Sequence, residues 1–226
     1  MRPRALVEAC VDTAELASAA EASGADRLEL CGPGEGGLTP PRELLELVMR
    51  RSRVPVHAMI RPREGDFCYT SDEFEAMRRD VVAVREAGAQ GAVFGVLRAD
   101  ATLDVDRMRV LVDLARPMRV ACHRAFDRTP DPDAALDELM ALGVDLVLTS
   151  GHARTATEGA EVLARHVRRA GNRITILGGG SIRAGNARAL LQATGLGEVH
   201  ARATDTEAFA ALVREVASLD QPPEPT

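Results

Sequence analysis

The chain has 226 residues, of which 46% are hydrophobic and 27% charged, and its formal net charge is -6. This composition is typical of a globular protein with one sizeable core, whereas an acidic chain with one Tyr and no Trp lacks the basic, aromatic surface that nucleic acids require. All 28 basic residues are Arg, and without Lys the chain cannot use Schiff-base chemistry, pyridoxal phosphate (PLP) or a P-loop.

The N-terminal segment, MRPRALVEACVDTAEL, does not have the pattern of a signal peptide. Glu8 and Asp12 interrupt it before an apolar stretch reaches the required length. No window approaches the roughly 18 apolar residues of a membrane span. We therefore expect a cytoplasmic protein with no membrane partner, whose four cysteines are free thiols.

Eight short aliphatic runs alternate with amphipathic stretches from end to end, which predicts strands and helices in strict alternation. The predicted strands are residues 6–11, 27–31, 54–60, 92–97, 118–123, 146–149, 174–177 and 198–201. Apolar residues recur at helical spacing between them, for example in PRELLELVMRR, SDEFEAMRRDVVAVREAG, PDAALDELMALG and ARALLQATG.

A repeat of two strand–helix units favours a closed barrel. Gly24, Gly88, Gly143 and Gly195 each end a helix before an even-numbered strand, whereas Arg or Pro precedes strands three, five and seven. Eight units in 226 residues leave about 28 residues each, which fits a (βα)8 barrel. We predict a single α/β TIM-barrel domain over residues 1–219 and a disordered tail over 220–226, with an open doubly wound sheet as the alternative.

Charged side chains interrupt the apolar strands near the carboxyl ends, where TIM barrels carry their functional sites. Period-two alternation places Glu8 beside Cys10, Glu29 beside Cys31, and Arg61 on the face of His57. These faces can point into the barrel together with part of the HRAFD segment. The candidate catalytic residues are Glu8, Glu29, His57, Arg61, His123, Arg124 and Asp127. The alternative is a set of buried ion pairs that neutralise one another.

Three loops are candidates for binding an anion. ILGGGSIRAGN follows the seventh strand, and glycines before a helix let backbone amides approach a phosphate. LTSG ends the sixth strand, and the long loop RPREGDFCYTSDE follows the third. The candidate anion-binding residues are Arg63, Ser150, Gly151, Gly178, Gly179, Gly180 and Ser181.

Each of these loops also has a purely structural interpretation. The glycine segment can be a tight turn, and the loop after the third strand can cap a helix that starts at Ser71 or Asp72. Arg63 then pairs with Asp66 or Glu64. His152, after LTSG, is expected on the surface.

Two familiar motifs fail on their context. The segment from Gly32 to Gly37 satisfies GxGxxG, but Pro33 interrupts it and the next helix begins only near Pro41, so we expect no nucleotide cofactor. GxSxG is absent, which leaves a serine hydrolase without support.

The chain resembles the CutC copper homeostasis family in VEACVDTAELA, SGADRLELC, EGGLTPP, IRPREGDFCYTSDEFEAM, GAVFGVL, HRAFDRTPDPDAAL, LTSG and GGGSIRAGN, from about Leu6 to Ala201. The resemblance implies a cytoplasmic TIM barrel, often a homo-oligomer, linked to copper tolerance and without an established reaction. It also implies Cu(I) ligands at Cys10 and Cys31. From spacing alone, these thiols and Met59 fit core packing as well as soft-metal binding.

Two functions remain as alternatives. One is a copper-homeostasis protein that binds Cu(I) through its thiols. The other is an enzyme for a small anionic or phosphorylated metabolite, with an acid and base drawn from Glu8, Glu29 and His123, and with Arg61 and Arg124 stabilising negative charge. Histidines and carboxylates of the same set could also hold a harder ion.

Overall fold

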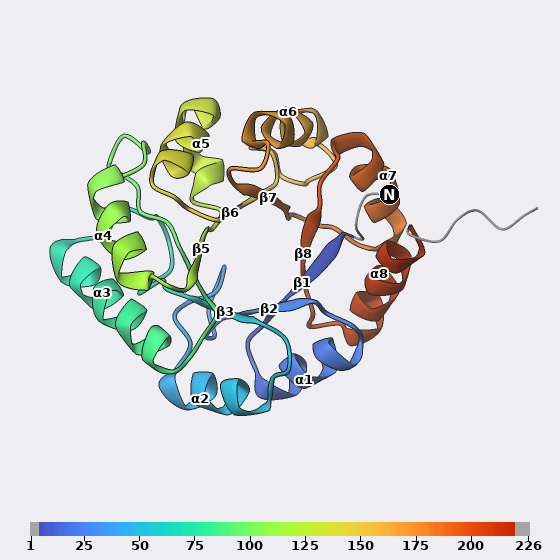
Figure 1. Ribbon diagram of the computed structural model, residues 1–226, viewed down its shortest axis with the longest axis horizontal. Coiled ribbons are helices and arrows are strands. Elements are labelled where there is room, and N and C mark those ends of the chain that lie inside the picture. The colour runs from blue at the N-terminus through green and yellow to red at the C-terminus, as the bar shows by residue number, and fades with distance from the viewer. Residues whose placement is uncertain (1–4, 220–226) are drawn as a thin grey trace, which may run out of the picture.

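The computed structural model describes residues 5–219, so the predicted disordered tail lies outside the described residues. Within that range, eight parallel strands pair in sequence order and close into a barrel, with β8 beside β1. Eight helices form an outer ring around the strands (Figure 1). The predicted TIM barrel is confirmed, and the open sheet is wrong because both edges of such a sheet are paired here.

The strands are β1 (Leu6–Val11), β2 (Arg27–Leu30), β3 (Val56–Met59), β4 (Gly91–Phe94), β5 (Arg119–Cys122), β6 (Leu146–Thr149), β7 (Thr175–Gly178) and β8 (Glu198–Arg202). The helices are α1 (Ala14–Ala22), α2 (Arg42–Arg51), α3 (Ser71–Glu86), α4 (Val105–Ala115), α5 (Pro132–Ala141), α6 (Ala160–Ala170), α7 (Ala184–Thr194) and α8 (Thr206–Ser218), with a 3-10 turn at Phe126–Arg128. β3 begins later than predicted, because Pro55 has no N–H for the sheet.

Several helices begin at side-chain caps that the sequence supplies. The Thr70 hydroxyl accepts a hydrogen bond from the Glu73 amide, and the Glu73 carboxylate accepts one from the Thr70 amide. Helix α3 therefore starts at Ser71, as predicted. The carboxylates of Asp131 and Asp205 cap α5 and α8 by accepting hydrogen bonds from backbone amides of the first turn.

Two apolar layers follow from the alternation of side chains along each strand. The larger layer lies between the strands and the surrounding helices. The smaller one comprises Cys31, Met59, Val93, Ala121 and Leu146, packed against Cys10. The expectation that Cys10, Cys31 and Met59 share the inside of the barrel is confirmed.

No helix within residues 5–219 combines the length and apolar character needed to cross a membrane.

Candidate functional site

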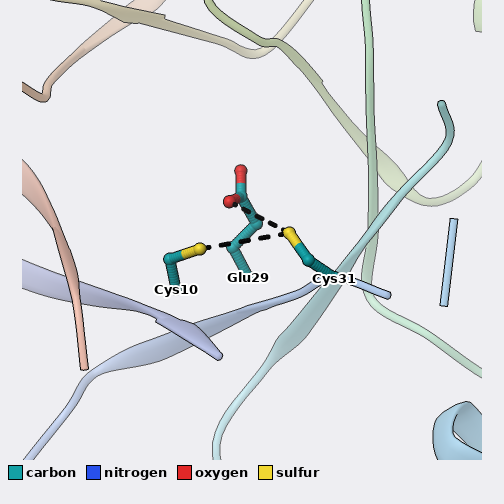
Figure 2. A group of neighbouring side chains, drawn as sticks. All are labelled: Cys10, Glu29 and Cys31. Atoms are coloured by element: carbon teal, nitrogen blue, oxygen red, sulfur yellow. Dashed lines mark hydrogen bonds between the residues drawn. The ribbon is translucent and has the colours of Figure 1, made fainter. Parts of the chain in front are cut away.

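Two thiols meet inside the barrel at the carboxyl ends of β1 and β2. Cys10 pairs in register with Glu29, and the backbone amide of Cys31 donates to Val11, so both side chains reach the same level. The two Sγ atoms lie 4.0 Å apart and are hydrogen-bonded to each other. Figure 2 shows both sulfurs and the Glu29 carboxylate converging, and the Cys31 thiol donates to Glu29 Oε2 over 3.6 Å.

The glycine-rich segment after β2 lies directly over Cys31. Gly37 has a φ of +79°, and a Cβ at this position would stand 2.6 Å from Cys31 Sγ, so a residue with a side chain does not fit. Arg61 Nη1 donates to the carbonyls of Glu35 and Gly37 at 2.8 and 3.4 Å. Residues 32–37, which satisfy GxGxxG, therefore cover Cys31, and Arg61 holds this segment in place.

The two thiols differ in their readiness to ionise. Their mutual hydrogen bond holds the pKa of Cys10 well below its usual value, with further help from His200 and Arg202 against the opposing effect of burial. The same hydrogen bond, together with burial, raises the pKa of Cys31 well above its usual value. The surroundings thus favour ionisation of Cys10 over ionisation of Cys31, and the thiolate is the form that binds metal ions.

A buried network of charges lies next to the thiols. Arg27 Nε contacts Glu8 Oε2 at 2.5 Å, and Arg27 Nη2 contacts Glu198 Oε2 at 2.7 Å. His200 Nδ1 lies 2.8 Å from Glu8 Oε1. Burial would raise the pKa of Glu8, but the hydrogen bond with His200 and the charge of Arg27 lower it to about 2. For Glu8, the structure thus contains the ion pairs that the alternative interpretation predicted.

Glu29 and His57 are buried in their neutral forms. Burial raises the pKa of Glu29 to about 8, even though His200 Nε2 lies 3.8 Å from its Oε2. Burial also lowers the pKa of His57 to about 4, with Glu8 Oε2 at 3.9 Å from its Nδ1. The ring of His57 fits because Gly91, its register partner on β4, has no side chain.

Three members of this network were missed from the sequence. Arg27 lies on the same face of β2 as Glu29, and both Glu198 and His200 lie on one face of β8. His200 pairs in register with Glu8. Alternation along β2 and β8, the signal used for the first three strands, would have found all three.

Two groups of potential metal ligands occur among residues 5–219. One comprises Cys10, Glu29 and Cys31, and the other Glu8, Glu29 and His200, with ligand atoms within 4.8 Å of one another. The first group contains two soft sulfurs, which favour Cu(I). The second has only oxygen and nitrogen atoms, and its Glu8 already binds Arg27 and His200.

His123 lies apart from the carboxylates with which it was expected to exchange protons. Its ring stands 4.8 Å from that of Phe67, and burial lowers its pKa to about 3. In the described part of the chain, no hydrogen bond or ion pair joins His123 to Glu8 or Glu29. The predicted acid–base pair is therefore not assembled in this structure.

Asp127 and its neighbours brace the loop after β6. Asp127 Oδ1 accepts from the Thr149 hydroxyl and the His152 amide, whereas Oδ2 accepts from the Ser150 amide and Arg124 Nε. The Ser150 hydroxyl accepts a further hydrogen bond from Arg124 Nη2. These predicted site residues come together as expected, but their polar groups bind one another.

His152 is only partly exposed, so the expectation of a surface position is not fully met. Its amide is held by Asp127, which directs the ring inward against Phe126, with ring centroids 5.0 Å apart. The side chain is half-buried and also contacts His166.

Asp127→Asn is expected to lower the free energy of unfolding by about 3 kcal/mol, since a buried carboxylate with several donors would be replaced by an amide. Burial opposes ionisation, but hydrogen bonds from Thr149 and Arg124 hold the pKa of Asp127 below its usual value. The stabilisation is therefore present above the unfolded pKa of about 3.9 and is lost as the pH falls below it. Urea unfolding at pH 7 and pH 3 measures both effects; an equal loss at both values would contradict this role.

The other predicted anion-binding residues have internal partners. Arg63 contacts Glu73 at 2.6 Å and Asp66 at 2.8 Å, so the predicted pair with Asp66 is present. Gly178 ends β7, and the Gly179 amide donates to Thr149. In the same turn, Gly180 and Ser181 have positive φ angles of +102° and +58°. In the loop after β6, the Gly151 amide donates to Thr149 Oγ1. Anion binding at these positions stays a prediction.

Comparisons with known proteins agree on one family. The family model for CutC matches residues 5–205. A Mesorhizobium japonicum protein named family protein CutC is 46% identical over 196 residues, which are 86% of this chain and 76% of that protein. A human protein named copper homeostasis protein cutC homolog is 43% identical over 202 residues, 89% of this chain and 74% of its own. The crystal structure of a putative copper homeostasis protein CutC from Streptococcus agalactiae has a TM-score of 0.82 at 28% identity, covering 87% of this chain and 97% of that one.

Proposed function

The chain belongs to the CutC family, and we propose that it serves copper homeostasis by binding one Cu(I) ion between the thiols of Cys10 and Cys31. The observation that carries this proposal is the 4.0 Å separation of their Sγ atoms. A thiolate–metal bond is about 2.3 Å long for zinc, so two such bonds allow sulfurs up to about 4.6 Å apart. The pair can therefore hold one ion between its sulfurs with little movement of the backbone.

The surroundings of the pair favour a soft ion over a hard one. Cys31 and Met59 belong to the apolar layer inside the barrel, and Cys10 packs against that layer. Thiolates and thioethers select Cu(I), whereas Mg²⁺, Ca²⁺ and Mn²⁺ require oxygen ligands. Glu29 offers the nearest oxygen, but burial raises its pKa to about 8 and keeps it neutral at pH 7.

The group of Glu8, Glu29 and His200 is a weaker candidate for metal binding. A metal ion at Glu8 would have to displace Arg27 or His200, whose contacts with this carboxylate are 2.5 and 2.8 Å long. It would also place an additional positive charge beside the buried guanidinium. The proposal therefore assigns copper to the thiol pair alone.

Anaerobic titration of the protein with Cu(I), in competition with a chromogenic chelator, tests the proposal. We expect one tightly bound ion per chain, and X-ray absorption at the copper edge should report two sulfur neighbours. Mg²⁺ and Mn²⁺ serve as controls and should not compete. A protein that fails to remove Cu(I) from the chelator, or that binds it through nitrogen and oxygen only, would rule out the thiol site.

A further inference from the structure

Arg61 is a buried cation with no anionic partner. Its side chain lies at the barrel mouth after β3, and the residue is 6% exposed. Its two terminal nitrogens donate to the carbonyls of Glu35, Gly37 and Gly65, and its Nε has no partner. Within residues 5–219, no carboxylate lies within ion-pair distance of this guanidinium. A charge taken out of water in this way is costly unless a counterion accompanies it.

Two other buried groups near Arg61 have polar atoms without partners, namely Tyr69 Oη and His123 Nε2. Both residues are 4% exposed. His123 Nδ1 accepts a hydrogen bond from the Ala125 amide, so the neutral ring carries its proton on Nε2. The side chains of Arg61 and Tyr69 also interact with each other, but the protons on Arg61 Nε, Tyr69 Oη and His123 Nε2 have no acceptor among the described residues.

Arg61 and His123 pack against one aromatic ring, and Tyr69 lies close to Arg61. The Arg61 guanidinium lies 5.0 Å from the centroid of the Phe67 ring, and the His123 ring lies 4.8 Å from it. Burial raises the pKa of Tyr69 to about 12, while the nearby charge of Arg61 partly offsets that rise. Phe67 is half-buried and thus more exposed than the three donors.

We propose that Arg61, Tyr69 and His123 form a binding site for the carboxylate group of a small organic molecule. A carboxylate is acceptor-only, which suits three donors that have no acceptor of their own. It also brings a single negative charge, which matches the single charge of Arg61 beside a neutral imidazole and a neutral phenol. A phosphate dianion would leave excess negative charge in a buried site.

This inference goes beyond the copper proposal and does not depend on it, because none of the three donors is a copper ligand. The sequence predicted, as an alternative function, action on a small anionic metabolite. The three residues give that function a specific location. Arg63 and Arg124 are excluded from this site, since carboxylates already neutralise both.

Tyr69 is the only tyrosine in a chain without tryptophan, so its fluorescence reports directly on the site. We expect sodium acetate, titrated into the metal-free protein at constant ionic strength, to change this fluorescence and to shift the His123 ring signals in nitrogen-15 NMR. Sodium chloride should do neither. Inorganic phosphate should bind more weakly than acetate; tighter binding of phosphate would overturn the assignment to a carboxylate.

Tyr69→Phe removes one donor, together with the interaction of its hydroxyl with Arg61, and keeps the aromatic ring. We expect it to weaken acetate binding at least about tenfold, as for the loss of one hydrogen bond to a charged group, when affinity is measured from the His123 signals. Thermal stability without acetate should stay equal or rise, because a buried hydroxyl whose proton has no acceptor is removed. Thr194→Val is the control, since it removes a buried hydroxyl at the far end of α7 and should leave acetate binding unchanged. Equal affinity in Tyr69→Phe and wild type, or no response to acetate in the wild type, would overturn the proposal.

Discussion

Replacement of both Cys10 and Cys31 by serine is expected to abolish tight Cu(I) binding while the barrel stays folded. Neither thiol anchors the backbone, and their polar contacts are with each other, with Glu29 and with His200. Serine hydroxyls are hard donors with little affinity for Cu(I). We expect the competition titration to show a loss of more than about a hundredfold, because even the loss of an outer partner of a metal ligand costs about 10- to 100-fold.

The other two cysteines provide matched controls. Cys68 is half-buried in the loop after β3, and Cys122 is packed in the apolar layer outside the strands, where burial raises its pKa to about 12. Cys68→Ser and Cys122→Ala should therefore keep wild-type Cu(I) affinity. Each single variant, Cys10→Ser or Cys31→Ser, should resemble the double variant. Copper affinity that survives in the double variant, or that is lost in either control, would place the site elsewhere.

Arg27→Met is expected to have the largest effect on stability. Its guanidinium neutralises both Glu8 and Glu198, and methionine has a similar length but no charge. Loss of one partner from a buried ion pair costs about 3–5 kcal/mol, because the remaining carboxylates stay buried without a counterion. Urea unfolding at pH 7 should show a decrease of this size.

A triple variant separates lost charge from lost packing. Adding Glu8→Gln and Glu198→Gln to Arg27→Met removes the unpaired carboxylates, so most of the stability should return. Arg188→Met is the surface control, because its pair with Glu215 is partly exposed and should contribute less than about 1 kcal/mol. If the triple variant is as unstable as Arg27→Met alone, packing rather than charge is responsible.

The pH dependence of the wild type follows from the same network. The pKa of Glu8 is about 2, below that of an unfolded glutamate at about 4.3. A lowered carboxyl pKa contributes stability above the unfolded value and loses it as the pH falls through the folded value. The difference between wild type and Arg27→Met should therefore shrink between about pH 4 and pH 2.

Strand alternation identified most residues of the site, but not which of them contact one another. Alternation placed Cys10 and Glu8 on one face of β1, and Cys31 and Glu29 on one face of β2. It could not show that the register of β1 and β2 brings the two sulfurs to 4.0 Å. It also could not show that His123, directly after β5, contacts Phe67 instead of the carboxylates on β1 and β2.

The order of the elements, the closed barrel and the identity of the buried polar residues were determined by the sequence itself. These properties depend on local spacing, since apolar periodicity specifies each strand and helix and polar residues stand out within it. The partners of the buried charges were decided only by the tertiary structure. Arg27 is 19 residues from Glu8 and 171 from Glu198, and barrel closure brings β8 beside β1. Charge balance in a buried site depends on which side chains meet in space, so Arg27 neutralises Glu8, whereas no carboxylate of the described residues meets Arg61.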